Sequence, residues 1–362
     1  VVGGADDEQS PAGDGGQTEG DFIVDPEAER ITEEQAEYLT ELYEAAIDDG
    51  GNLVVYSGLA EDMEGVFDLY EEMFPGMTIT AESLRGAPLM QALQAEQESG
   101  NHVADVLQNP DAQRYVFQLG DFSQPYEVQT LKVPDRLSDS VDQIIDPEFR
   151  YSTAFLGFFG LGTFLPRLEE AGGMPESFAD LGDPRFEGLV GFADPTIPGP
   201  SQGALLYLLA SGGLDEESLN GIARNSVVKG DHGQTIAGLM QGEFAFQFGA
   251  PVSAVVLAAD QGAPVEFSVF PSDNPLVTHK HVLLDGAPNE NAGKLYLEFL
   301  NLFSAQQRIA DIGLIPLDED ASDPDAPWTS MEAAGVNEIV PYDVIDQAHE
   351  EFMPMIEDAF AR

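Results

Sequence analysis

The sequence predicts an α/β fold in which two lobes each carry a mainly parallel sheet. Its length, its composition and the alternation of strand-like with helical segments all favour this fold class. At 362 residues the chain exceeds the roughly 250 to 300 residues that one hydrophobic core usually organises. An apolar fraction of 43%, including 22 Phe, is ample for packed cores. Short β-branched runs alternate with helical segments at the spacing of βαβ units, which place parallel strands side by side.

The first half of the chain shows this alternation clearly. A helix is expected at 33–49, where apolar residues recur at helical spacing, and the pair Gly50–Gly51 stops it. The expected elements that follow are strands at 53–56, 77–81 and 104–107, a helix at 61–74 and a second helix that ends near Gln97.

The second half opens with the apolar, extended run Tyr151–Phe164, followed by a helix-and-loop stretch at 165–186. Gly160 and Gly162 lie inside that run and are expected to serve hinge or packing needs, because the third Gly of a dinucleotide fingerprint is missing. The later elements are expected to be strands at 189–192, 243–248, 265–270 and 282–284 and helices at 204–210, 235–240, 291–302 and 344–360.

The net charge of −52 comes from 66 acidic and 14 basic residues, and only four of these are Lys. Repulsion on this scale destabilises a compact state at low ionic strength and is tolerable when molar salt shortens the Debye length to about 3 Å. We therefore expect a protein from a halophile, with an archaeon as the favoured source. Nucleic acid and anionic membrane surfaces are excluded as partners, because both would be repelled.

The chain contains no Cys, which excludes disulfides, thiolate metal sites and a Cys nucleophile. No apolar run reaches the length of about 18 residues that a membrane span needs. Residues 1–25 are Gly-rich and acidic, and we expect them to form a flexible linker. We expect this linker to continue from a removed or upstream N-terminal segment that anchors the protein, through a lipid, at the extracellular face of the cytoplasmic membrane.

Five segments are informative through their order and spacing along the chain. They are Leu42–Gly58, Ala104–Gln108, Asp183–Pro195, Met240–Phe246 and Ala287–Gln307. Together they resemble the landmarks of the family 1 extracellular solute-binding proteins of ABC transporters. The branch that they resemble contains binders of ferric iron and of 2-aminoethylphosphonate, and the resemblance spans about 42–317.

The resemblance implies a type 2 periplasmic-binding-protein fold, in which two α/β lobes joined by two crossover strands close on a ligand. The crossovers would lie near 151–160 and 272–278. Lobe one would contain 52–150 and 279–315, and lobe two would contain 151–278 and 330–362. The implied function is capture of a small molecule, without catalysis and without a cofactor, by a monomer that delivers its ligand to the membrane permease of an ABC transporter.

The candidate ligand-binding residues lie where strands end and helices begin, because ligands of open α/β sheets bind there. Free N–H groups and the macrodipole make a helix N-terminus suited to anions, and Gly lets a ligand approach closely. The candidates are Ser57, Gly58, Arg85, Gly86, Ser201, Gln202, His232, Gln234, Thr235 and, next to a crossover, His279. Arg85 is the expected clamp for a carboxylate or phosphate. The alternative is that the hydroxyl residues only cap their helices and that Arg85 pairs with a surface acid.

The preferred ligand is a small anion such as a phosphonate, phosphate ester or carboxylate. Ferric iron with a synergistic anion is the main alternative within transport. The iron-binding members of the resembled family use His, Glu and two adjacent Tyr, and those positions correspond here to Ala60, Pro110, Val252 and Ser253. No metal site is therefore expected, and the His279–Lys280–His281 run lacks a nearby third ligand.

Two further function classes stay open. A cationic ligand would need aromatic and carboxylate groups in the cleft, and Phe158, Phe159, Phe248 and Tyr56 are the candidates for this role. A hydrolase or transferase on the same scaffold is the enzyme alternative, because a fold alone does not fix function. The chain has no G-x-S-x-G elbow, P-loop or H-E-x-x-H motif, and no catalytic residue is expected.

Overall fold

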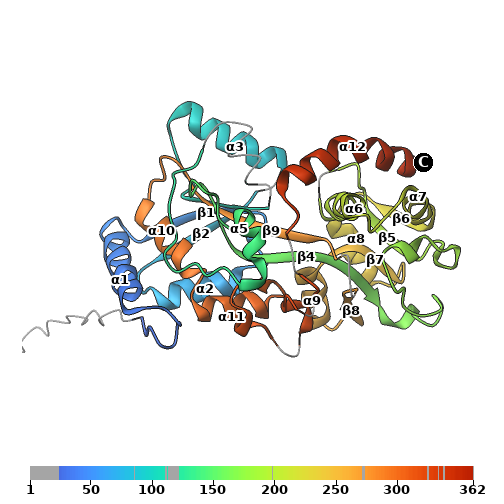
Figure 1. Cartoon of the computed structure of the whole chain (residues 1–362), viewed down its shortest axis with the longest axis horizontal. Helices are drawn as coiled ribbons and strands as arrows, with labels where there is room; N and C mark the ends of the chain where they lie inside the picture. The colour runs from blue at the N-terminus through green and yellow to red at the C-terminus, as the bar shows by residue number, and fades with distance from the viewer. Residues whose placement is uncertain are drawn as a thin grey trace, which may run out of the picture.

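The computed structural model describes residues 24–84, 86–110, 112, 122–197, 199–270, 274–323, 326–332, 334–336 and 339–361. Its helices are α1 (Glu33–Asp48), α2 (Glu64–Met73), α3 (Gly86–Ser99), α5 (Val141–Ile144), α6 (Pro200–Ser211), α7 (Glu216–Asn225), α8 (His232–Met240), α9 (Val252–Asp260), α10 (Glu290–Phe299), α11 (Phe303–Asp311) and α12 (Tyr342–Phe360). Its strands are β1 (Asn52–Ser57), β2 (Thr78–Ser83), β3 (Val106–Asn109), β4 (Ser152–Phe164), β5 (Val190–Ala193), β6 (Ser226–Lys229), β7 (Phe246–Pro251), β8 (Val265–Ser268), β9 (Leu276–Leu283) and β10 (Ile315–Pro316). The two α/β halves lie side by side and are joined by β4 and β9, as Figure 1 shows.

The sheet has the strand order β2-β1-β3-β9-β4-β7-β5-β6, with β8 and β10 also paired to β4. The outer strands are parallel within each half, since β1 pairs with β2 and β3, and β5 pairs with β6 and β7. The central strands are antiparallel. This arrangement confirms the predicted fold class of two α/β lobes joined by two crossover strands.

The crossover strand β4 changes partners halfway along its length. Residues up to Phe158 pair with β9, whereas later residues pair with β7 and β8, and the register shifts between Gly160 and Leu161. A Cβ on Gly160 would lie 2.3 Å from Phe267 Cζ, and one on Gly162 would lie 2.9 Å from Leu239 Cδ2. The two glycines therefore serve close packing where the strand passes from one half to the other.

Each half has its own buried cores. In the first half, one core lies between the sheet, α1, α2 and α10 and includes Leu39, Tyr70 and Phe299. Helix α1 belongs to this half through its packing on α10, although the predicted lobe boundaries left 26–51 unassigned. In the second half, Phe192 and Phe248 stack beneath α6 and α12. The lobe boundaries themselves stay a prediction.

The sequence pattern missed several elements for identifiable reasons. Helix α9 is apolar and rich in Val, so it gives no helical stripe, and the four-residue strand β6 is too short for a periodic signal. The expected helix at 291–302 corresponds to α10 alone, and α11 was not expected. Residues 165–186 form only short 3₁₀ turns. Among the described residues, no helix combines the length and apolar character needed to cross a bilayer.

Candidate functional site

Ser57 and Gly58 lie at the carboxyl end of β1, where the predicted site begins. Both are buried. The Leu59 N–H donates to Ser57 Oγ at 2.9 Å, and Gln108 Nε2 donates to the same oxygen at 3.0 Å. Tyr296 Oη in turn donates to Gln108 Oε1 at 2.9 Å. The Ser57 hydroxyl thus holds the turn after β1 and ties it to the end of β3. It does not cap α2, whose N-cap is Met63 without a side-chain hydrogen bond.

Gly86 begins α3 and is exposed, with a left-handed φ of 56°. A Cβ at this position would meet no atom within 4 Å. The backbone at the start of α3 is therefore accessible to a small molecule. Arg85, the predicted clamp, lies outside the described residues.

A cavity of about 420 Å³ lies beside the ends of β1 and β2, near the start of α2. Its lining residues are Ala60, Glu61, Glu64, Phe67, Ala81 and Ser83. Two of these residues carry carboxylates, which repel an anion and attract an amine or a neutral polar group. An anionic group is therefore better placed elsewhere in the site.

In the second half, Ser201 and Gln202 form the buried first turn of α6. The N-cap is Gly199, which has no side chain to satisfy the first N–H groups of the helix. Gln202 Nε2 donates to the Pro195 carbonyl at 3.0 Å and fixes the loop that leads into the helix. The α6 N-terminus also packs closely on β7, because a Cβ on Gly249 would lie 3.2 Å from Ser201 Cα.

Helix α8 begins with the three other predicted residues of this half, and its start is already capped. Asp231 accepts hydrogen bonds at 2.7 Å from the backbone N–H and from Nε2 of Gln234. Thr235 is buried and donates to the Asp231 carbonyl at 2.7 Å. The half-buried His232 has its Nδ1 3.2 Å from Gln247 Nε2 on β7. The Asp231 carboxylate disfavours an anion at α8, whereas the start of α6 has no side-chain cap.

The crossover strand β9 carries three buried basic side chains. His279 stacks on Phe155 at a centroid distance of 5.1 Å, and a Cβ on Gly157 would lie 3.2 Å from its Nε2. Lys280 is only 3% exposed, donates to Thr278 Oγ1 and lies 5.6 Å from the Tyr151 ring centroid. It is opposite Asn109, the last residue of β3, in the sheet. A buried lysine side chain therefore lies beside the carboxyl end of β3.

The structure brings the predicted residues together in two groups rather than one. Ser57, Gly58 and Gly86 belong to the first half, and the residues of α6 and α8 belong to the second half, where β7 contacts both helices. His279 lies between the groups on the strand that joins the halves. None of the hydrogen bonds found among the described residues links one group to the other. A ligand that uses both groups would therefore have to bridge the two halves.

Sequence reasoning missed Asp231, Gln108 and Lys280. Asp231 had a readable signal, because an Asp three residues before Gln234 is typical of a helix cap. Gln108 and Lys280 had no such signal, since their importance follows from burial and from strand pairing. No group of three His, Cys, Asp or Glu suited to a metal ion occurs within the described part of the chain.

No protein-family model matches the chain, and no curated protein matches it. Solved structures do match. A substrate-binding protein of an ABC transporter from Agrobacterium tumefaciens is 14% identical with a TM-score of 0.69, over 85% of this chain and 95% of that one. The periplasmic binding protein AfuA from Actinobacillus pleuropneumoniae, solved with exogenous fructose-6-phosphate, is 20% identical with a TM-score of 0.63, over 85% and 97%. Iron-bound HitA from Pseudomonas aeruginosa is 15% identical with a TM-score of 0.63, over 85% and 99%.

These similarities extend over most of each chain, and the identities are low. They establish the fold class, which is the type 2 periplasmic-binding-protein fold.

Proposed function

We propose that the protein is the solute-binding component of an ABC importer, which captures a small molecule between its lobes and delivers it to a membrane permease. The observation that carries this proposal is the division of the candidate site between two halves joined by β4 and β9. A ligand that contacts both halves stabilises the closed arrangement through its differential affinity for that state. The ABC-transporter substrate-binding protein from Agrobacterium tumefaciens and the periplasmic binding protein AfuA, which share this fold, support the same function.

The proposed ligand is a small molecule with one anionic group, such as a phosphonate, phosphate ester or carboxylate. Its acidic group would bind at the start of α6, where Gly199 leaves the first N–H groups uncapped, with Arg85 as the predicted clamp from the other half. The carboxylates of Glu61 and Glu64 favour a neutral or amine-bearing remainder. AfuA, which was solved with a phosphate ester, supports this ligand class.

Ferric iron with a synergistic anion is the second candidate, and the iron-bound neighbour HitA favours it. Val252 and Ser253, which stand where the iron-binding relatives are expected to have Tyr, are both buried at the start of α9 and offer no phenolate. Iron would therefore need a different ligand set in this chain. A hydrolase or transferase is the enzyme alternative, and it predicts turnover of a bound ligand.

The proposed setting is the extracellular face of the cytoplasmic membrane in a saline environment, with a lipid anchor upstream of the described residues. The protein would act as a monomer. The acidic surface supports the saline setting, because the 66 carboxylates need screening.

A thermal-shift screen in about 2 M KCl tests the proposed function. The probes are 2-aminoethylphosphonate, fructose 6-phosphate, inorganic phosphate, acetate, ferric citrate and spermidine. We expect one anionic probe to raise the melting temperature in a concentration-dependent manner, because ligand at about 100 times Kd adds about 2.7 kcal/mol. Arg85→Ala should lower the affinity of the protein for that probe at least about tenfold.

Each other outcome points to a different function. A response to ferric citrate alone would favour the iron binder, and a response to spermidine alone would favour a cationic ligand. No response to any probe would count against small-solute capture. Conversion of the probe into a product would favour the enzyme.

A further inference from the structure

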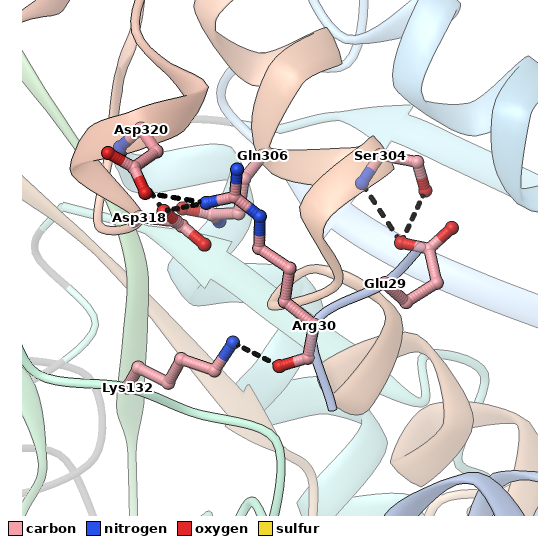
Figure 2. Close-up of polar contacts among 7 residues, drawn as sticks. All are labelled: Glu29, Arg30, Lys132, Ser304, Gln306, Asp318 and Asp320. Atoms are coloured by element: carbon pink, nitrogen blue, oxygen red, sulfur yellow. Dashed lines mark hydrogen bonds and ion pairs between the residues drawn. The ribbon is translucent and has the colours of Figure 1, made fainter. Parts of the chain in front are cut away.

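Residues 24–32 precede α1, and we call them the strap. Glu29 and Arg30 of the strap contact the start of α11 and the chain that follows it (Figure 2). Glu29 in this strap is buried, and its Oε2 accepts hydrogen bonds at 3.0 Å from both the backbone N–H and Oγ of Ser304. Ser304 lies in the first turn of α11, whose N-cap residue Leu302 supplies no capping side chain. The strap therefore provides the carboxylate that caps a helix about 275 positions later in the chain.

Arg30 fastens the strap to the chain that follows α11. Its guanidinium lies 3.6 Å from the Phe303 ring centroid, and its Nη1 is 2.8 Å from Asp320 Oδ2 and 3.4 Å from Asp318 Oδ1. Its backbone carbonyl accepts a hydrogen bond of 2.6 Å from Lys132 Nζ. Arg30 adopts a left-handed φ of 57°, which is uncommon for a residue other than Gly and needs support from its surroundings. The strap thus joins three segments that are far apart in the sequence.

The other end of α11 meets the second half of the molecule. Gly313, two residues beyond the helix, has φ +82°, and a Cβ on it would lie 2.7 Å from Val252 Cγ1 and 3.5 Å from the Ser253 nitrogen. Val252 and Ser253 begin α9, which packs against β4, β7 and β8. Figure 1 shows α11 and α9 next to each other along the lower edge of the molecule. The contact leaves no room for a side chain at Gly313.

The segment between these two ends is attached to the crossover strand β4. Ile315 pairs with Leu156, and Pro316 pairs with Phe155. Leu314 packs against Gly157, since a Cβ there would lie 3.4 Å from Leu314 Cδ2. A shift of α11 would therefore displace both β4 and the start of α9.

We propose that the strap, α11 and the start of α9 form a rigid link that sets the relative orientation of the two halves. The strap fixes one end of α11 in the first half, and the contact of Gly313 with Val252 transmits the position of the other end to the second half. Packed contacts of this kind switch between discrete arrangements rather than deforming gradually. Releasing the strap therefore shifts the population of open and closed arrangements without touching any ligand. The inference builds on the proposed function, in which the lobes move relative to each other.

The absence of Cys makes a direct measurement possible, because two introduced Cys are the only labelling sites. Glu44 on α1 and Glu217 on α7 are exposed and lie on helices at opposite ends of the molecule (Figure 1). Spin labels at Glu44→Cys and Glu217→Cys report the distance between the halves by double electron–electron resonance. The measurement needs no ligand, so it succeeds or fails independently of the thermal-shift screen.

The test variant is Arg30→Gln, which removes the ion pairs with Asp318 and Asp320. Arg308→Gln is the matched control. Arg308 lies within α11, and it forms its ion pair with Asp311 of the same helix, at 3.4 Å, rather than with another segment. We expect Arg30→Gln to change the ratio of the distance populations roughly three- to fivefold, the size of a partly exposed charge-assisted contact. Gly313→Ala should also shift the ratio, since the added Cβ would displace Val252 at the other end of the link. Arg308→Gln should leave the ratio unchanged.

Two results would overturn the inference. One is an unchanged distance distribution in Arg30→Gln while hydrogen exchange shows that residues 24–32 have been released. The other is an equal shift in Arg308→Gln, which would assign the effect to general electrostatics. If Arg30→Gln does not fold, Asp320→Asn removes only the exposed acceptor and is judged by the same two criteria together with Gly313→Ala.

Discussion

Lowering KCl from about 2 M to about 0.1 M is expected to reduce the melting temperature by at least about 10 °C. The cause is the net charge of −52. Two like charges 10 Å apart in water repel by about 0.4 kcal/mol before screening, and the Debye length grows from below about 3 Å to about 10 Å over this range. Dozens of such pairs add several kcal/mol, a large share of the typical 5 to 15 kcal/mol of stability.

The outer face of α1 shows how dense this charge is. Its exposed acids are Glu33, Glu34, Glu37, Glu41, Glu44 and Asp48. Many of these are three or four positions apart, where like charges destabilise a helix. We therefore expect the melting temperature of the triple variant Glu37→Lys, Glu41→Lys, Glu44→Lys to fall less than that of the parent as the KCl concentration decreases. KCl is used because sulfate would strengthen apolar burial by itself. A melting temperature independent of KCl in both proteins would contradict the role assigned to the acidic surface.

Acidification from about pH 7 to about pH 4 is expected to cost the parent protein about 3 kcal/mol through His281 alone. Burial lowers the pKa of this side chain from 6.5 to about 3, and the backbone of Ser152 opposes the shift only in part. The folded state thus binds fewer protons than the unfolded state between these two pKa values. The stabilising contribution is complete above about pH 6.5 and is lost as the pH falls toward about 3.

The measurement is urea unfolding of the parent and of His281→Leu at several pH values and constant KCl. Protonation of the surface acids affects both proteins, so the difference between them isolates His281. The gap in unfolding free energy should move by about 3 kcal/mol in favour of the Leu variant as the pH falls. His349→Leu, at an exposed position of α12, is the control for replacing a His by Leu. Parallel pH profiles for the parent and His281→Leu would show that His281 does not titrate as inferred.

Much of the fold could be predicted because local signals and tertiary packing agree. Helix α1 begins with a capping box at Thr32 and Gln35 and ends near Gly50, so its expected and observed bounds differ by one residue. Strand β4 is long and apolar, as a buried crossover strand should be. Helix α9 could not be recognised, because its exposed side also carries apolar residues such as Leu257. Sequence periodicity reveals the boundary between core and solvent only where the exposed positions are polar.

The candidate site was less predictable, because helix starts look alike in sequence whether or not they are capped. Asp231 satisfies the start of α8, whereas Gly199 leaves the start of α6 without a side-chain cap. The environment of Ser57 depends on Gln108, which comes from a strand some 50 residues away. Glu29 and Arg30 contact residues in and after α11 that are still farther away in the sequence. Such contacts follow from topology rather than from local pattern, so residue types alone did not reveal them.

The most direct test is a crystal structure of the protein with the probe that raises its melting temperature most, grown in high salt. The proposed function predicts that the probe lies between the halves, with its anionic group on the backbone N–H groups of Ser201 and Gln202 and a second contact from the end of β1 or the start of α3. A probe bound only to one half, for example within the cavity beside Glu61 and Glu64, with the halves oriented as in the unliganded protein, would contradict capture by closure.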